Sequence, residues 1–145
     1  MTLPNPDIKG DLPQGLHQAT LEEVIVRFGG NTDARKYLTT YLVRIYNLVN
    51  ATNSAERFII FGSYITDKPE PNDIDIFLVM SEAFNIDDYT GETRDIFSHG
   101  RAQRIFRASV FWVNKATSLA TIDDLIEGWQ TKRDQTKRGI VEVIK

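Results

Sequence analysis

Apolar residues form several short runs that are typical of buried β-strands. Two of these runs are rich in β-branched and aromatic residues, Arg57–Phe61, which ends at Gly62, and Asp73–Met80. Residues Phe106–Val113 alternate and predict another strand of the same sheet. Gly139–Ile144 predicts a terminal strand that forms a sheet edge or a pairing element.

Helical spacing separates these runs. Thr20–Glu23 matches a capping box and precedes a helix with apolar residues at the i, i+3, i+4, i+7 spacing, which Gly29–Gly30 ends. A longer helix is predicted from a cap near Asn31–Asp33 to about Asn50, and others from about Tyr89 to His99 and from Thr121. We expect the first two helices to cover one face of the sheet.

Residues 1–18 are rich in proline and show little periodicity, so they predict an irregular lead. It is expected to pack across the domain through Leu3, Ile8, Leu12 and Leu16. His17 is interpreted as a surface or packing residue. A chain of 145 residues without a linker or an internal repeat predicts one domain, residues 1–145.

Composition narrows the class of protein. Hydrophobic residues make up 41% and charged residues 26% of the chain, which is ordinary for a globular protein, and the net charge of −3 argues against a general nucleic-acid coat. Without cysteine there is no disulfide or thiolate site. The N-terminus lacks the features of a signal peptide, and no run approaches the roughly 20 apolar residues of a membrane span. We expect a soluble cytoplasmic protein with no membrane partner.

The candidate chemistry lies at the junction of the two central strands. Asp73 and Asp75 lie on one face of their strand, roughly 6–7 Å apart at a rise of about 3.3 Å per residue. Paired carboxylates repel, and Mg²⁺ relieves that repulsion while also binding phosphate oxygens. Gly62 allows a phosphate to approach the backbone closely, and Ser63 with the following amides can donate to it.

These residues resemble the DNA-polymerase-beta-like nucleotidyltransferase superfamily, in which Gly-Ser after one strand is followed by Asp-x-Asp at the start of the next. The wider chain is similar to an uncharacterised bacterial family within it, through the segments Leu12–Thr20, Thr66–Pro71 and Gly139–Val141.

The resemblance implies an α+β fold of the nucleotidyltransferase type, with a central mixed β-sheet and helices packed on one side. It also implies that Asp73 and Asp75 hold Mg²⁺, and that Gly62 and Ser63 bind the phosphates of a nucleoside triphosphate. Lys68, in the linker, is a candidate for the triphosphate or a solvated lysine. The acceptor can be a small molecule, an RNA end or a protein side chain.

One position departs from the superfamily pattern. Active members usually carry a third carboxylate on a later strand, and Ser109 stands there in this chain. Serine is a poor metal ligand and no base near pH 7. Glu142 or Asp95 is a possible substitute that nothing in the sequence places there. The alternative to transfer is therefore a weakly active or inactive regulatory or binding module. The resemblance implies for such a module an antitoxin-like role, in a toxin-antitoxin pair beside a helical toxin.

Two basic segments are further candidates for binding a negatively charged ligand or partner. Arg101, Arg104 and Arg107 would form one ridge on a helix, suited to phosphate or RNA backbone, unless Arg107 begins the next strand. The run Gln130–Arg138 is the most basic in the chain and is expected to be an exposed loop.

Overall fold

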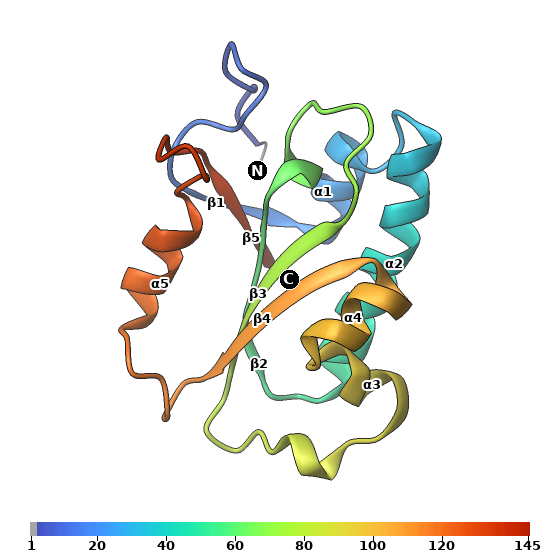
Figure 1. The fold of residues 1–145 in the computed structure, drawn as a ribbon, viewed down its shortest axis with the longest axis vertical. Coiled ribbons are helices and arrows are strands. Elements are labelled where there is room, and N and C mark those ends of the chain that lie inside the picture. Colours follow the sequence, from blue (N-terminus) through green and yellow to red (C-terminus); the bar gives the residue numbers. More distant parts are fainter. Residues whose placement is uncertain (1–2) are drawn as a thin grey trace.

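The structure is a computed structural model that describes residues 3–145. Its fold is built on one mixed five-stranded sheet (Figure 1). The strand order is β1-β5-β2-β3-β4. The strands are β1 Leu16–Thr20, β2 Ala55–Phe61, β3 Ile74–Met80, β4 Ala108–Asn114 and β5 Ile140–Ile144. The α+β class is confirmed, and the predicted central strands are present.

The register of the central strands brings the candidate residues to one end of the sheet. β2 and β3 are antiparallel and pair Phe61 with Asp75, whereas β3 and β4 are parallel and pair Asp75 with Ser109. Gly62 therefore follows directly after the residue opposite Asp75. Three strands thus contribute to one short stretch of the sheet.

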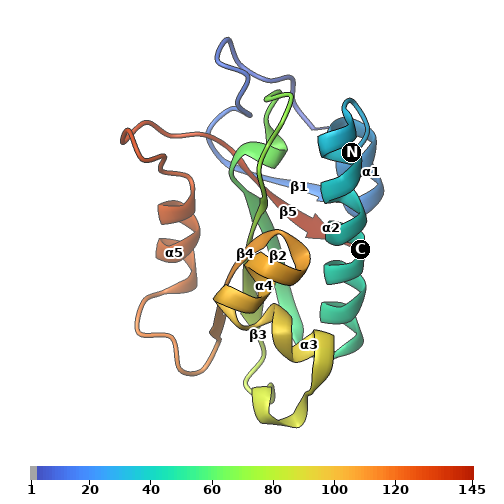
Figure 2. The ribbon, with the colours of Figure 1, turned by 45° about the vertical axis from the view of Figure 1, so that its right-hand side comes forward.

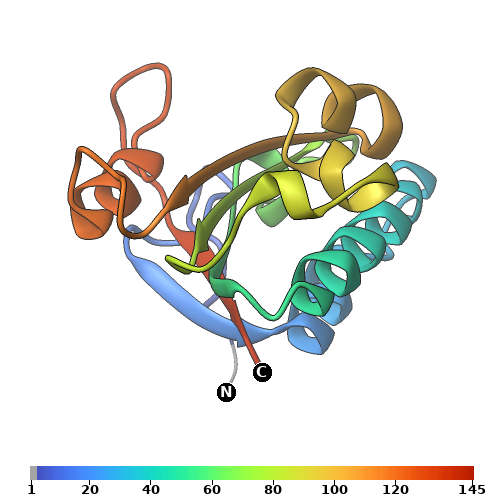
Figure 3. The same cartoon turned by 90° about the horizontal axis from the view of Figure 1, so that it is seen from below.

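Four helices cover one face of the sheet, and α5 covers the other (Figures 2 and 3). The four are α1 Leu21–Phe28, α2 Asp33–Ala51, α3 Gly91–Ile96 and α4 His99–Phe106, and α5 spans Ile122–Trp129. The prediction of helices on one side only is therefore wrong for α5. No helix of residues 3–145 has the length and apolar character needed to cross a membrane.

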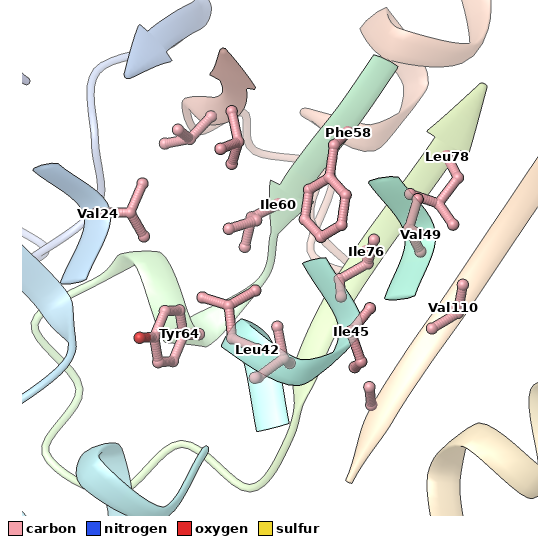
Figure 4. Close-up of a cluster of buried hydrophobic side chains, with 14 of the residues drawn as sticks. Val24, Leu42, Ile45, Val49, Phe58, Ile60, Tyr64, Ile76, Leu78 and Val110 are labelled. Atoms are coloured by element: carbon pink, nitrogen blue, oxygen red, sulfur yellow. The ribbon is translucent and has the colours of Figure 1, made fainter. Parts of the chain in front are cut away.

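The alternation of the strands explains both layers. Ile60, Ile76 and Val110 face α2 and form the larger core with Leu42 and Ile45 (Figure 4). The intervening residues Ile59, Phe77 and Val79 face the opposite way and are 0–2% exposed. They form a second core with Ile122, Leu125, Ile126 and Trp129 of α5. A sheet that is apolar on both faces requires a cover on each.

The capping predictions are confirmed. The Thr20 hydroxyl accepts from the backbone N–H of Glu23, and the Glu23 carboxylate accepts from that of Thr20, both at 3.2 Å. Gly29 caps the end of α1, and Thr32 caps the start of α2.

The N-terminal lead differs from its prediction at its end. Leu16–Thr20 forms β1, which pairs in parallel with β5, so the irregular segment stops before Leu16. β5 itself lies between β1 and β2 and is not a sheet edge. Leu3 and Leu12 are buried as predicted, but Ile8 is fully exposed. Met1 and Thr2 lie outside the described residues.

The segment after β3 also departs from its prediction. One helix was predicted from Tyr89 to His99, whereas the chain forms α3 and α4 with a break at Phe97–Ser98. The following strand begins at Ala108, because Phe106 is the last residue of α4 and Arg107 caps it in the left-handed conformation, with φ of 50°. A single apolar stripe could not reveal the break.

Arg35 on α2 is a buried arginine that organises the loop between β2 and β3. The residue is only 2% exposed. Its guanidinium donates to the carbonyl oxygens of Thr66 and Lys68 at 2.6 Å and of Tyr64 at 2.7 Å, with further bonds to Phe28 at 3.0 Å and Ser63 at 3.5 Å. It also lies over the Tyr64 ring at 5.6 Å. One side chain thus fixes the path of the loop that follows Gly62.

We predict that Arg35→Met destabilises the protein by about 3 kcal/mol or more, because several buried carbonyls lose a charged donor. The matched control is Arg44→Met on the same helix, since Arg44 is exposed and pairs with Glu92. Its expected loss is at most about 1 kcal/mol. Urea unfolding measures both, and equal losses in the two variants would contradict the role assigned to Arg35.

Candidate functional site

The Asp75 carboxylate lies directly against the bend at Gly62. Gly62 has φ of 81° and ψ of −165°, a conformation open mainly to glycine. A Cβ atom added there would lie 1.9 Å from Oδ2 of Asp75. The structure therefore brings together the glycine bend and the second aspartate, as the sequence predicts.

Asp75 is held in an unfavourable electrostatic environment for a lone carboxylate. Burial and then the neighbouring Asp73 raise the pKa of Asp75 from 3.8 to about 6. Arg138, Arg133 and a hydrogen bond from Ser109 act in the opposite direction. The charges of the two aspartates thus interact, which is the condition under which a cation is stabilising.

Asp73 lies just before β3 and is bonded by neutral side chains. Its Oδ2 accepts from the Gln103 amide and is also 3.2 Å from the Ser109 hydroxyl. The Ser109 hydroxyl is 2.9 Å from Oε1 of Gln103 as well. Ser109 therefore stands between the two aspartates, at the place predicted for a third acid.

Neither proposed substitute acid joins the site. Glu142 accepts two hydrogen bonds from Arg57, at 2.8 and 2.9 Å. Asp95 pairs with Arg101 at 3.1 Å. In the part of the chain that the structure describes, no three histidine or acidic side chains group in a way that could hold a metal ion. The acidic donors of the site are Asp73 and Asp75.

Of the two other predicted phosphate-binding residues, Ser63 lies at the glycine bend, whereas Lys68 forms no ion pair with either aspartate within the described residues. Ser63 follows the bend as the first residue of a short 3₁₀ helix, Ser63–Ile65, and its carbonyl oxygen accepts from Thr66 and Arg35. Lys68 contributes through its main chain, whose carbonyl oxygen accepts from Arg35. Among residues 3–145, the Lys68 ammonium forms no ion pair with Asp73 or Asp75.

Arginines of the loop before β5 lie within electrostatic range of Asp75, which the sequence did not reveal. Arg133 and Arg138 both lower the pKa of that carboxyl. The loop is attached to the N-terminal lead, because the buried Asp11 pairs with Lys132 at 3.1 Å and with Arg138 at 3.7 Å. These ion pairs with Asp11 hold the basic loop Gln130–Arg138 near the candidate site. The contact joins residues far apart in the sequence, so no local sequence pattern shows it.

The donor set fits Mg²⁺ in part. Carboxylates are hard oxygen donors, and Mg²⁺ usually takes one or two of these and completes its shell with water and phosphate oxygens. The missing side chain of Gly62 leaves room for the Asp75 carboxylate itself, and the positive charges of Arg133 and Arg138 act on that carboxylate. The chemistry of the two carboxylates is therefore compatible with one Mg²⁺ whose remaining ligands are water or phosphate oxygens.

The chain belongs to a family of unknown function, DUF6932, whose sequence profile matches residues 4–144. No curated protein and no solved structure gives a significant match.

We predict that Gly62→Ala destabilises the protein by about 3 kcal/mol, since backbone strain adds to a clash with Asp75. Gly91→Ala is the matched control, because Gly91 also has positive φ, at 65°, but has open space around its Cα. It should lose only about 1 kcal/mol. In an Asp75→Ala background, the cost of Gly62→Ala should fall to that of the control. Urea unfolding of the five proteins would contradict the contact if this cost did not change.

The raised pKa of Asp75 predicts a pH dependence of stability in the presence of EDTA. Between about pH 4 and pH 6 the folded chain keeps a proton that the unfolded chain has lost, so stability falls as pH rises, by roughly 2–3 kcal/mol. Asp75→Asn lacks this loss of stability. The free energy of unfolding of the variant minus that of the unsubstituted protein should therefore increase from pH 4 to pH 7. A constant difference across that range would show that Asp75 is not buried as described.

Proposed function

We propose that the chain is a minimal nucleotidyltransferase that binds a Mg²⁺-nucleoside triphosphate and transfers its nucleotidyl group to a hydroxyl acceptor. The observation that supports this best is the contact of the Asp75 carboxylate with the Gly62 bend, with Asp73 beside it. An acidic pair and a glycine turn are combined there at the same end of the sheet. They match the two halves of the superfamily motif.

Each residue has a distinct part in this proposal. Asp73 and Asp75 would hold Mg²⁺, which neutralises charge that develops on the α-phosphoryl group. Gly62, Ser63 and the following residues would donate to the phosphates through backbone N–H groups, and the Ser63 hydroxyl would add a further donor. Arg133 and Arg138 would balance the β- and γ-phosphates. Lys68 remains a candidate for the same phosphates.

The reaction would join the acceptor oxygen to the α-phosphorus as the bond to pyrophosphate breaks. The hydroxyl proton would leave to water, because Ser109 stands where a third acid would accept it and is no base near pH 7. Slow transfer is therefore expected compared with an enzyme that has all three acids.

A second candidate function follows from the same serine. The chain would then be a nucleotide-binding module with little or no transfer, acting as a regulatory protein or as an antitoxin beside a helical toxin. The register that pairs Asp75 with Ser109 favours it, because it leaves no acid at that position of β4. Both functions include binding of Mg²⁺-nucleotide, and only the first includes transfer to a small-molecule, RNA or protein acceptor.

We predict that calorimetric titration detects Mg²⁺-dependent binding of a nucleoside triphosphate to the purified chain. Asp73→Ala and Asp75→Ala should each weaken that binding at least about tenfold, since each removes a metal ligand. Asp88→Ala, at an exposed aspartate in the 3₁₀ helix Ile86–Asp88, should have no effect. Binding that persists unchanged without Mg²⁺ or in both aspartate variants would contradict the proposal.

Ser109→Asp separates the two candidate functions. A third acid should destabilise the metal-free protein by repulsion and should be rescued by Mg²⁺, so its melting temperature should rise with Mg²⁺ more than that of the unsubstituted protein. Incubation with labelled triphosphates and candidate acceptors should show slow transfer that Ser109→Asp accelerates. Tight nucleotide binding without transfer in either protein would instead favour the binding module.

A further inference from the structure

A cavity of about 350 Å³ lies beside Asp73, on the side of the α2 and α4 helices. Its walls come from α2, from the C-terminal half of α4 and from the residues that precede β3. This volume lies within the range of small-molecule sites, about 300–1,000 Å³. Because Asp73 forms part of the wall, the cavity opens on the candidate metal site.

Arg107 lines the cavity in a conformation that its position does not favour. It ends α4 with φ of 50° and ψ of 44°, where glycine is the usual residue. Its guanidinium lies over the Tyr37 ring at 5.7 Å and donates to the carbonyl oxygen of Asn72 at 3.2 Å. Backbone strain of this kind is often found at functional sites. An arginine at a position better suited to glycine therefore indicates that its positive charge serves to bind a ligand.

Arg104, one turn earlier on α4, adds a second guanidinium to the same wall. Within residues 3–145, neither Arg104 nor Arg107 forms a salt bridge. Arg101 on the same helix, by contrast, pairs with Asp95. The three arginines therefore do not form one ridge. Arg101 is paired with Asp95, whereas Arg104 and Arg107 line the cavity and keep N–H donors available for a ligand.

The remaining wall supplies hydroxyl and amide groups. The Tyr37 and Tyr41 hydroxyls are 3.1 Å apart, and their rings meet edge to face. The Gln103 amide donates to the Asp73 carboxylate, which is also part of the wall. Two cations, two phenols and an amide suit a small molecule that combines a phosphate with hydroxyl groups.

We propose that this cavity is the acceptor subsite and that it binds a small phosphate monoester of a sugar or a nucleoside. Arg104 and Arg107 bind the phosphate, and the phenols and Gln103 bind hydroxyl groups, one of which lies toward Asp73 where transfer takes place. The acceptor role rests on the proposed nucleotidyltransferase function. Binding of the phosphate ester does not, because it needs no metal.

The test is a calorimetric titration with adenosine 5′-monophosphate and glucose 6-phosphate in EDTA, with adenosine and glucose as phosphate-free controls. At least one ester should bind and its parent compound should not. Arg104→Gln and Arg107→Gly should each weaken that binding at least tenfold, whereas Arg101→Gln should not. Arg107→Gly suits the left-handed backbone, so its thermal stability should equal or exceed that of the unsubstituted protein.

The outcomes separate this inference from the proposed function. If neither ester binds while Mg²⁺-nucleoside triphosphate binds normally, the cavity inference is wrong and the proposed function stands. If an ester binds but no triphosphate does, the phosphate-ester site stands and the acceptor role is wrong. Competition between ester and triphosphate would make the cavity part of the nucleotide site. Much tighter binding of a 5′-phosphorylated oligonucleotide would overturn the small-molecule assignment in favour of RNA.

Discussion

The candidate site depends on one steric constraint, the contact between the Asp75 carboxylate and the Gly62 backbone. The β2–β3 register sets Asp75 opposite Phe61. The Asp75 side chain therefore lies against Gly62, the residue after Phe61, where a Cβ atom does not fit. The buried guanidinium of Arg35 then fixes the loop after that glycine through its carbonyl oxygens. The packing of Asp75 against Gly62 and the hydrogen bonds of Arg35 thus set the geometry of the candidate site.

Positively charged side chains surround the acidic pair, although the chain as a whole is negatively charged. The chain has a net charge of −3, yet arginines approach the aspartates from two directions. Arg133 and Arg138 come from the loop before β5 and act on Asp75, whereas Arg104 and Arg107 come from the end of α4 and line the cavity beside Asp73. These two cationic surfaces beside one acidic pair are the basis of the proposal that the site takes two phosphate-bearing ligands with a cation between them.

Local patterns predicted much of the fold, because apolar strand runs, helix caps and helical spacing depend on residues that are neighbours in the sequence. The glycine–aspartate contact was also predictable, since it needs only two strands and their spacing. β1 was missed because its partner is more than a hundred residues away. α5 was placed with the other helices because periodicity does not say which face of a sheet a helix covers. Arg35 and Arg133 were missed because an arginine in a helix or in a basic run gives no sign of what it contacts.

The most direct test of the central claim is a crystal structure of the chain with Mn²⁺ and a non-hydrolysable nucleoside triphosphate. We predict an anomalous peak within coordination distance of carboxylate oxygens of both Asp73 and Asp75, with phosphate oxygens beside the Gly62 bend. A metal and nucleotide bound elsewhere, or ordered nucleotide at the bend with no metal between the aspartates, would contradict it.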